Sequence, residues 1–293
     1  MNLMVSTDDK IRVSWRELLE AAVTQPGLIH EAYSRFWNYS FGNQILALLQ
    51  CKARGIQPGP IATFQRWKDL GRHVRKGEKA LTLCMPVTIK CREWDRSRQE
   101  EGLTSGEPSQ ESGTRTVFVF KRNWFVLSQT EGAEFDLPPI PHWQKEQALQ
   151  ALGIFEEPFN LLDGNCQGYA TKTGRVAVSP VAVLPHKTLF HEVAHLILGH
   201  LGDEGSERLT DGENLPRSIR EAEAEAVALL CCESLGLAGA DFARGYVQEW
   251  LGPDELPERS AQRILKATDT ILRAGWVEPS QTLTPSTLKS DSE

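Results

Sequence analysis

Two histidines four residues apart, with a glutamate directly after the first, stand in the segment TLFHEVAHLILGH at residues 188–200. At 100° per residue, His191 and His195 lie about 40° apart on a helix, so both rings can reach one metal ion. The rest of the segment is nearly all apolar, which predicts a buried helix. Unsatisfied polar groups there cost about 1 to 3 kcal/mol each, which favours a metal site over hydrogen-bonded core or surface histidines.

Glu192 follows the first histidine and stays free of the ion, in the place where a carboxylate holds the attacking water. Zinc held by two imidazoles and a carboxylate lowers the pKa of its water toward about 7, and Glu192 would take the proton. The expected activity is amide hydrolysis by a zinc-dependent metallopeptidase. Zinc is favoured by the ligand types, although manganese or another divalent ion also fits such a site.

A catalytic zinc site needs a third protein ligand and one open position. His200 is nearby, but the extended histidine pattern requires its third histidine six residues after His195, not five. The acidic segment SIREAEAEAVALLCCESLG, residues 218–236, is the better source. We assign Glu221 as the ligand, and Glu225, one helical turn along, as the carboxylate that orients a histidine or replaces Glu221.

Glu221 also has a purely structural interpretation. Ser218-x-x-Glu221 is a capping-box pattern, in which Glu221 would accept a hydrogen bond at a helix N-terminus.

Two other segments extend the peptidase hypothesis. The strand expected at residues 175–180 is placed to pair with an extended peptide, and Tyr169 is a candidate oxyanion donor, with half-buried packing as the alternative.

Charge divides the chain unevenly. The formal net charge is −7, yet residues 1–140 carry 19 basic against 16 acidic side chains, and residues 52–98 carry 12 against 4. The three prolines of LPPIPHW, residues 137–143, mark a linker between a basic and an acidic part. The expected organisation is a basic first domain at 1–138 with a mobile loop at about 93–115, an acidic second domain at 139–277 and a disordered tail at 278–293.

The basic part combines cations with aromatic rings, as single-stranded nucleic acid requires for its phosphates and exposed bases. TFQRWKDLGRHVRKGEK at 63–79 and KRNWF at 121–125 hold both kinds of side chain. The alternative is that the aromatic residues are core and the cations a solvated rim. The candidate residues for contact with single-stranded nucleic acid from these segments are Trp67, Arg72, Arg75, Lys76, Lys79, Lys121, Arg122 and Trp124.

Periodicity predicts an α+β protein. Helices are expected at 9–24, 34–50, 63–71, 186–198, 216–235 and 258–274, and strands at 80–90, 116–127 and 175–180. The strands at 80–90 and 116–127 should form an antiparallel pair.

No apolar run approaches the roughly 18 residues of a membrane span, and the N-terminus lacks the apolar core of a signal peptide, so we expect a cytoplasmic protein without a membrane partner.

In order along the chain, NYSFGNQILALLQ, GRHVRKGEKA, VFVFKRNWFVLSQTEG, TLFHEVAHLILGH and REAEAEAVALLCCESLG resemble the ArdC-like antirestriction proteins of conjugative plasmids. The resemblance implies a domain that binds single-stranded DNA, followed by a zincin-like metallopeptidase domain. It implies that Asn43, Gln44, Arg75, Lys76, Gly77 and Lys79 lie in or near the DNA-binding module, and His191, Glu192, His195 and Glu221 at the metal.

Three functions remain open at this stage. The first is an antirestriction protein that binds incoming single-stranded plasmid DNA and carries a gluzincin-type peptidase site, whose protein substrate would be a restriction-system component or regulator. The second is a DNA-coating protein with a structural metal. The third is a cytosolic metallopeptidase that cuts a regulator and has no role in DNA binding.

Overall fold

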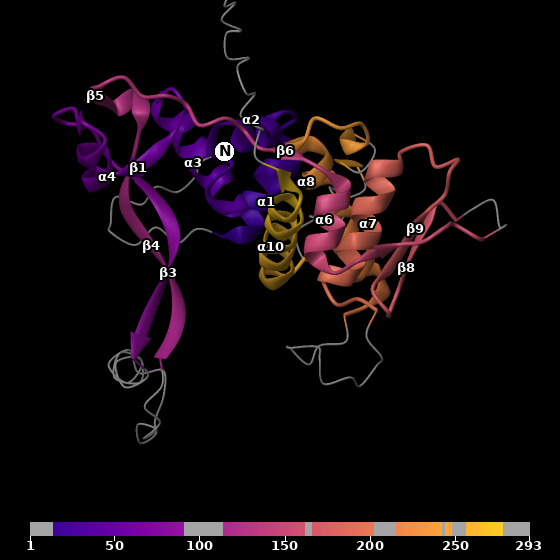
Figure 1. The fold of residues 1–293 in the computed structure, drawn as a ribbon. Helices are drawn as coiled ribbons and strands as arrows, with labels where there is room; N and C mark the ends of the chain where they lie inside the picture. Colours follow the sequence, from indigo (N-terminus) through magenta and orange to yellow (C-terminus); the bar gives the residue numbers. More distant parts are fainter. Residues whose placement is uncertain are drawn as a thin grey trace, which may run out of the picture. The chain divides into compact units, whose positions relative to one another are not determined.

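The computed structural model in Figure 1 describes residues 14–90, 114–161, 166–201, 215–241, 244–245, 247 and 256–277. The chain divides into two compact units, of which unit 1 contains residues 43–135 and unit 2 contains residues 14–42 and those from 136 onward. The sequence had placed residues 14–42 in the first domain instead. They lie in unit 2 because their helices bury apolar faces there. The expected tail at 278–293 and loop at 93–115 lie outside the described residues, apart from 114 and 115.

Unit 1 is built around an antiparallel sheet with the strand order β1-β4-β3. A long ribbon of two strands, β3 (Leu81–Lys90) and β4 (Thr114–Val126), forms most of it, as the sequence predicted (Figure 1). The smaller elements are α3 (Phe41–Arg54), β1 (Ile61–Thr63), α4 (Phe64–Asp69), β2 (Arg72–Val74), the 3-10 helix η1 (Leu127–Gln129) and β5 (Thr130–Gly132). Thr63 caps α4 by accepting a hydrogen bond from the Arg66 backbone N–H.

Helix α3 covers the edge of β3 with amide side chains that pair like another strand. The Asn43 side chain donates to the Cys84 carbonyl at 2.8 Å and accepts from the Cys84 N–H at 2.9 Å. Two turns along, Gln50 makes the same two bonds to Thr82 at 2.8 and 2.9 Å. These bonds satisfy the buried backbone of an edge strand, which would otherwise be left unpaired.

Unit 2 is mainly helical. Its helices are α1 (Trp15–Thr24), α2 (Leu28–Phe36), α6 (Lys145–Leu152), α7 (Pro185–Ile197), α8 (Arg217–Ser234) and α10 (Glu258–Ala274). Its strands are β6 (His142–Trp143), β7 (Phe155–Glu156), β8 (Gly168–Thr171), β9 (Arg175–Val178) and β10 (Trp276–Val277). Helix α8 is buried along most of its length and packs against α7, α10 and α2. Helix α7 therefore lies between α8 and the sheet of β8 and β9.

Two expectations need correction. The helix predicted at 34–50 is two helices, α2 and α3, because the chain leaves helical conformation between Trp37 and Ser40. The strand predicted to pair with a substrate is β9, but β9 is the central strand of the order β7-β9-β8. Arg175 and Val176 pair on both sides, so β8 is the edge strand beside α7.

Within the described residues, no helix has the length and apolar character required to cross a bilayer.

Candidate metal centre

The apolar residues of helix α7 fix which face of the helix is buried, and its two candidate ligand histidines lie on one side of the helix. Pro185 stands at the first turn, where its missing N–H costs nothing. Leu189, Phe190, Val193 and Ala194 are buried. His191 and His195 lie one turn apart, and their Nε2 atoms are 3.1 Å from each other.

Glu221 of α8 completes a triangle with these two nitrogens. Its Oε2 lies 3.4 Å from Nε2 of His191 and 3.7 Å from Nε2 of His195. Ligands about 2.0 to 2.1 Å from a tetrahedral ion are separated from one another by roughly 3.3 Å. The three separations bracket that value, and the donor set of two imidazoles and a carboxylate suits a divalent ion.

The capping-box alternative for Glu221 is wrong. Helix α8 begins at Arg217 after Pro216, and no side chain caps its N-terminus. Ser218 is therefore inside the first turn rather than at the N-cap, and Glu221 faces the histidines of α7. Its position follows from the packing of α8 against α7.

Glu225 lies one turn beyond Glu221 and contacts His191 on the side of the ring away from the other candidate ligands. Nδ1 of His191 donates to Glu225 Oε2 at 3.1 Å, which leaves Nε2 facing the other two ligand atoms. The second carboxylate oxygen of Glu225 is 2.6 Å from Nζ of Lys187. The structure thus places Glu225 where the sequence expected a carboxylate that orients a histidine.

A helix-ending turn brings a third histidine to His195. Gly199 has φ +71°, and the N–H groups of Gly199 and His200 donate to the carbonyls of Leu196 and His195 at 3.2 and 2.9 Å. This is a Schellman motif, which requires a left-handed residue at the position of Gly199. The chain reverses there, and Nδ1 of His200 lies 2.9 Å from Nδ1 of His195. His200 is thus a neighbour of the ligand set.

The metal-free charges at the centre are set by burial and by the carboxylates. Burial opposes protonation of His191, but its hydrogen bonds to Glu221 and Glu225 outweigh burial and raise its pKa to about 9. Burial, followed by the charges of His191 and His200, lowers the pKa of His195 to about 4. The hydrogen bond to His191 lowers the pKa of Glu221 to about 2 despite burial. One proton on His191 therefore partly balances the carboxylates.

Glu192 lies between α7 and β8. Burial raises the pKa of its carboxyl, and the nearby charge of Glu221 adds to this while His191 opposes it. A raised pKa suits a general base that works near neutral pH. A Cβ built at Gly168 would be 3.2 Å from Cγ of Glu192 and 2.5 Å from Cγ2 of Thr188, so only glycine permits this packing. No motif contains Gly168, so this packing role could not be predicted from the sequence.

Tyr169 does not point into the centre. Because the Cβ direction of Gly168 faces α7, the next side chain along the strand faces the opposite side of the sheet. The hydroxyl of Tyr169 donates to Glu157 at 3.1 Å. The interpretation of Tyr169 as an oxyanion donor is therefore wrong, and the packing alternative holds.

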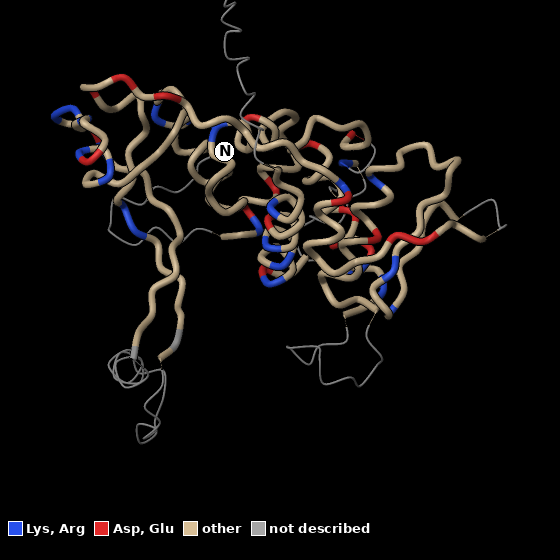
Figure 2. Tube along the Cα trace, in the orientation of Figure 1, with Lys and Arg blue, Asp and Glu red and all other residues tan. Residues whose placement is uncertain are grey.

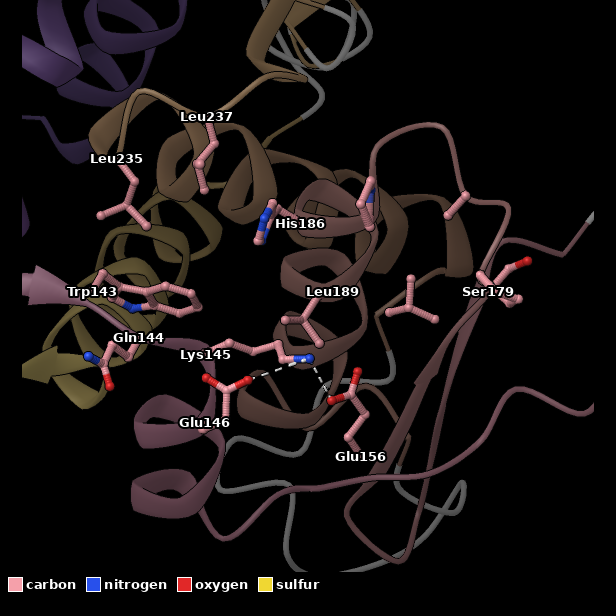
Figure 3. A pocket seen from close by; sticks show the side chains of 14 residues that line it. Trp143, Gln144, Lys145, Glu146, Glu156, Ser179, His186, Leu189, Leu235 and Leu237 are labelled. Atoms are coloured by element: carbon pink, nitrogen blue, oxygen red, sulfur yellow. Dashed lines mark hydrogen bonds and ion pairs between the residues drawn. The ribbon is translucent and has the colours of Figure 1, made fainter.

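A cavity of about 690 Å³ lies elsewhere in unit 2 (Figure 3). Trp143, His186 and Leu189 line it. Lys145 and Glu156 also line it, and Nζ of Lys145 lies 2.7 Å from Oε2 of Glu156. Leu189 and His191 are two residues apart, or about 200° around α7, so the cavity is on the far side of the helix from the ligand histidines. It is not the metal centre.

Four of the candidate DNA-contacting residues are buried in unit 1: Asn43, Gln44, Trp67 and Trp124. Trp67 is 1% exposed, donates its indole N–H to the Phe125 carbonyl at 2.8 Å and packs edge-on against Phe135. Its face is not available to a base, nor is that of Trp124. The core alternative is the one that the structure supports for these rings. Asn43 is occupied by the edge of β3.

The basic candidates differ in their surroundings. Arg72 is tied down by Thr130 at 2.9 Å and by the Ala133 carbonyl, and Arg75 bonds to Glu78 and the Ser128 carbonyl. In Figure 2, red segments accompany the blue ones around α4 and β2. The solvent-exposed candidates are Arg75, Lys76, Lys79, Lys121 and Arg122. The exposed aromatic side chains of unit 1 among the described residues include Phe64, which belongs to the basic and aromatic segment at 63–79, and Phe118, which the sequence had not selected.

Residues 1–125 match the sequence model of the N-terminal domain of anti-restriction factor ArdC. Over most of its length the chain also has the fold of the metal-free crystal structure of the antirestriction ArdC protein from plasmid R388. That comparison gives a TM-score of 0.50 and 22% identity, and it covers 89% of this chain and 94% of the R388 protein. The chain has an ArdC-like fold, and its first 125 residues match the ArdC N-terminal domain.

The ArdC-like fold extends to a metal-bound relative. The Mn(II)-bound structure of the R388 protein has a TM-score of 0.52 at 19% identity, covering 90% of this chain and 98% of that one. An uncharacterized Bacillus anthracis protein, pXO2-81, is 24% identical over 277 residues. That match covers 81% of this chain and 45% of the relative, so the chain spans about half the length of this curated protein.

Proposed function

We propose that this ArdC-like chain is an antirestriction protein that binds single-stranded DNA and carries a gluzincin-type, metal-dependent peptidase site in the cytoplasm. The observation that carries the metal half is the triangle of ligand atoms on His191, His195 and Glu221, with sides of 3.1, 3.4 and 3.7 Å. The manganese-bound relative supports a divalent ion in a protein of this fold. The nitrogen-rich donor set favours zinc.

The geometry favours an open site over a closed structural one. Structural zinc sites use four protein ligands, whereas catalytic sites use three and keep one position for substrate or water. Within the described part of the chain, the candidate ligand cluster consists of the two histidines and Glu221. This supports catalysis over the alternative of a structural metal in a DNA-coating protein.

In the proposed reaction, each residue at the centre has one task. His191, His195 and Glu221 would hold the ion, which as a Lewis acid polarises a substrate carbonyl and acidifies water. Glu192 accepts the proton of the attacking water and then passes it to the leaving amine. Its buried position raises its pKa, so the carboxylate holds the proton long enough to deliver it. The product is a cleaved peptide bond.

The edge strand β8 is the proposed seat of the substrate backbone. Ser179 N–H donates to the Gln167 carbonyl, so by alternation the backbone groups of Gly168 and Ala170 point to the outer edge of the sheet. Gly168 also packs against Glu192. An extended peptide that adds to this edge would pass beside the general base.

The DNA half rests on unit 1. Exposed cations at Lys76, Lys79, Lys121 and Arg122 would follow phosphates, and Phe118, on the two-stranded ribbon, is 71% exposed. The ArdC N-terminal domain match covers this segment. We therefore move the proposed stacking role from Trp67 and Trp124 to the exposed phenylalanines.

The test compares wild type with Glu192→Ala in cells that receive a plasmid by conjugation under restriction. Loss of protection, with single-stranded-DNA binding and metal content intact, supports a role for peptide cleavage. Unchanged protection by Glu192→Ala rejects that role and leaves the DNA-coating alternative. A gel-shift series in rising salt separates both from a peptidase without DNA binding, because phosphate contacts lose affinity steeply with salt.

A further inference from the structure

Two buried polar residues outside the ligand set, His200 and Glu223, form a row of hydrogen bonds that ends at the proposed ligand His195. Nδ1 of His195 is 2.9 Å from Nδ1 of His200, and Nε2 of His200 is 2.8 Å from Oε2 of Glu223. The side chain of Glu223 is 0% exposed and that of His200 is 2% exposed. Water therefore does not compete for these contacts.

The hydrogen bonds from His195 through His200 to Glu223 can run in only one direction if His195 is to bind a metal. A neutral imidazole carries one N–H, and the nitrogen that binds a metal must offer its lone pair. Nε2 of His195 faces the other ligands, so its proton must be on Nδ1 and be donated to Nδ1 of His200. His200 must then carry its own proton on Nε2, where the Glu223 carboxylate accepts it.

The opposite polarity would disable the ligand. If His200 donated from Nδ1, Nδ1 of His195 would be the acceptor and the proton of His195 would move to Nε2, into the metal position. An ionised carboxylate only accepts hydrogen bonds, so Glu223 excludes this arrangement. Glu223 thus acts on His195 through an intervening ring, whereas Glu225 contacts His191 directly at 3.1 Å.

The surroundings hold this chain in place. Arg263 lies 3.4 Å from the same Glu223 oxygen and donates to the Leu198 carbonyl at 2.6 Å. Arg220 donates to the His200 carbonyl at 2.8 Å. The turn that carries His200 is therefore anchored at both of its ends. Among the described residues, Glu223 Oε1 has no hydrogen-bond partner, which is a costly arrangement for a residue with a purely structural role.

We propose that His200 and Glu223 are positioning residues of the metal centre, which hold His195 in the tautomer and orientation that bind the ion through Nε2. The inference rests on the proposed metal site and goes beyond it, since neither residue belongs to the ligand set or to the H-E-x-x-H pattern. Loss of such outer hydrogen-bond partners weakens metal binding by about 10- to 100-fold in other proteins.

The experiment measures the Zn²⁺ affinity of the chelator-treated full chain by competition with a chromophoric chelator. Glu223→Gln and His200→Phe should each weaken Zn²⁺ binding by about 10- to 100-fold. His200→Asn keeps an acceptor near the position of Nδ1 and should recover most of the affinity. Because both residues act through the same row of hydrogen bonds, the double variant His200→Phe with Glu223→Gln should lose little more Zn²⁺ affinity than either single variant.

The matched control is Glu233→Gln, which neutralises another buried carboxylate of α8. Glu233 pairs with Arg244 and accepts from the Gly27 N–H at 2.8 Å, so its loss should lower stability but leave Zn²⁺ affinity unchanged. Thermal unfolding of each metal-free variant shows that it is folded. Equal affinity in wild type and Glu223→Gln, or additive losses in the double variant, overturns the positioning role. A wild type that binds no Zn²⁺ overturns the proposed metal site instead.

Discussion

A Cβ atom at position 168 would lie 3.2 Å from Cγ of Glu192, so the edge strand of the sheet and the proposed general base are packed as closely as a glycine allows. The same atom would be 2.5 Å from Cγ2 of Thr188 and 3.1 Å from the Ala177 carbonyl. Helix α7 and strand β8 are thus held at one separation. The proposed substrate edge and the proposed general base are linked through that contact.

Gly168→Ala should therefore separate β8 from α7. Overpacking of this kind costs about 1 to 3 kcal/mol of unfolding free energy. A shift of Glu192 of about 1 Å should lower peptide hydrolysis by about 100-fold. Gly59→Ala is the control, because its added Cβ meets only Val126 at an ordinary 3.9 Å. Chemical denaturation and a hydrolysis assay compare the two, and equal behaviour of both variants would reject the packing argument.

Metal binding should depend on pH through His191. In the metal-free protein its pKa is raised to about 9, while that of His195 is lowered to about 4 and that of Glu221 to about 2. The ion needs the unprotonated ring, so the affinity should rise about tenfold per pH unit and level off above about 9. Calorimetry in buffers of different ionisation heat should show about one proton released near pH 7. An affinity that does not change with pH contradicts this assignment.

Glu225→Gln tests the contact behind His191. A neutral amide orients the imidazole less strongly, so Zn²⁺ affinity should fall about 10- to 100-fold. Glu156→Gln is the matched control, because Glu156 also pairs with a lysine, Lys145, at 2.7 Å but lies away from the ligands. Competition titrations of both variants measure the difference. If both lose the same affinity, the effect is a general one of charge.

Phe118→Ala should weaken single-stranded-DNA binding by about 1 to 3 kcal/mol without loss of stability, because the ring is exposed. Trp67→Ala should instead destabilise unit 1 by about 3 to 5 kcal/mol, as removal of a buried tryptophan does. Phe155, which is 65% exposed in unit 2, is the control for a general effect of removing a surface ring. Fluorescence anisotropy with labelled oligonucleotides would refute the ribbon assignment if Phe118→Ala and Phe155→Ala bind equally well.

The local pattern of the sequence was enough to predict the helices that carry the candidate ligands. His191 and His195 share a helix face by spacing alone, and an apolar 13-residue segment around them specifies a buried helix. Glu221 and Glu225 follow the same rule on α8. The sequence could therefore predict which helices would meet at the centre, but not how they end.

Features set by tertiary packing could not be predicted. His200 reaches His195 only because Gly199 takes a left-handed conformation, and Glu223 lies about 200° from Glu221 on the helix, so no periodicity links them. Tryptophan suits a core and a base-stacking surface equally well by composition. Strand β8 has four residues and no alternation of apolar and polar side chains, which left it undetected.

The proposed metal site is tested most simply by the metal content of the purified full chain after treatment with chelator and dialysis against Zn²⁺. Elemental analysis of wild type should give one zinc ion per chain. The His195→Ala variant, folded by circular dichroism, should give none, because two of the three ligands do not hold the ion through dialysis. A wild type without zinc, or a His195→Ala variant that keeps a full equivalent of zinc, would contradict a metal site formed by His191, His195 and Glu221.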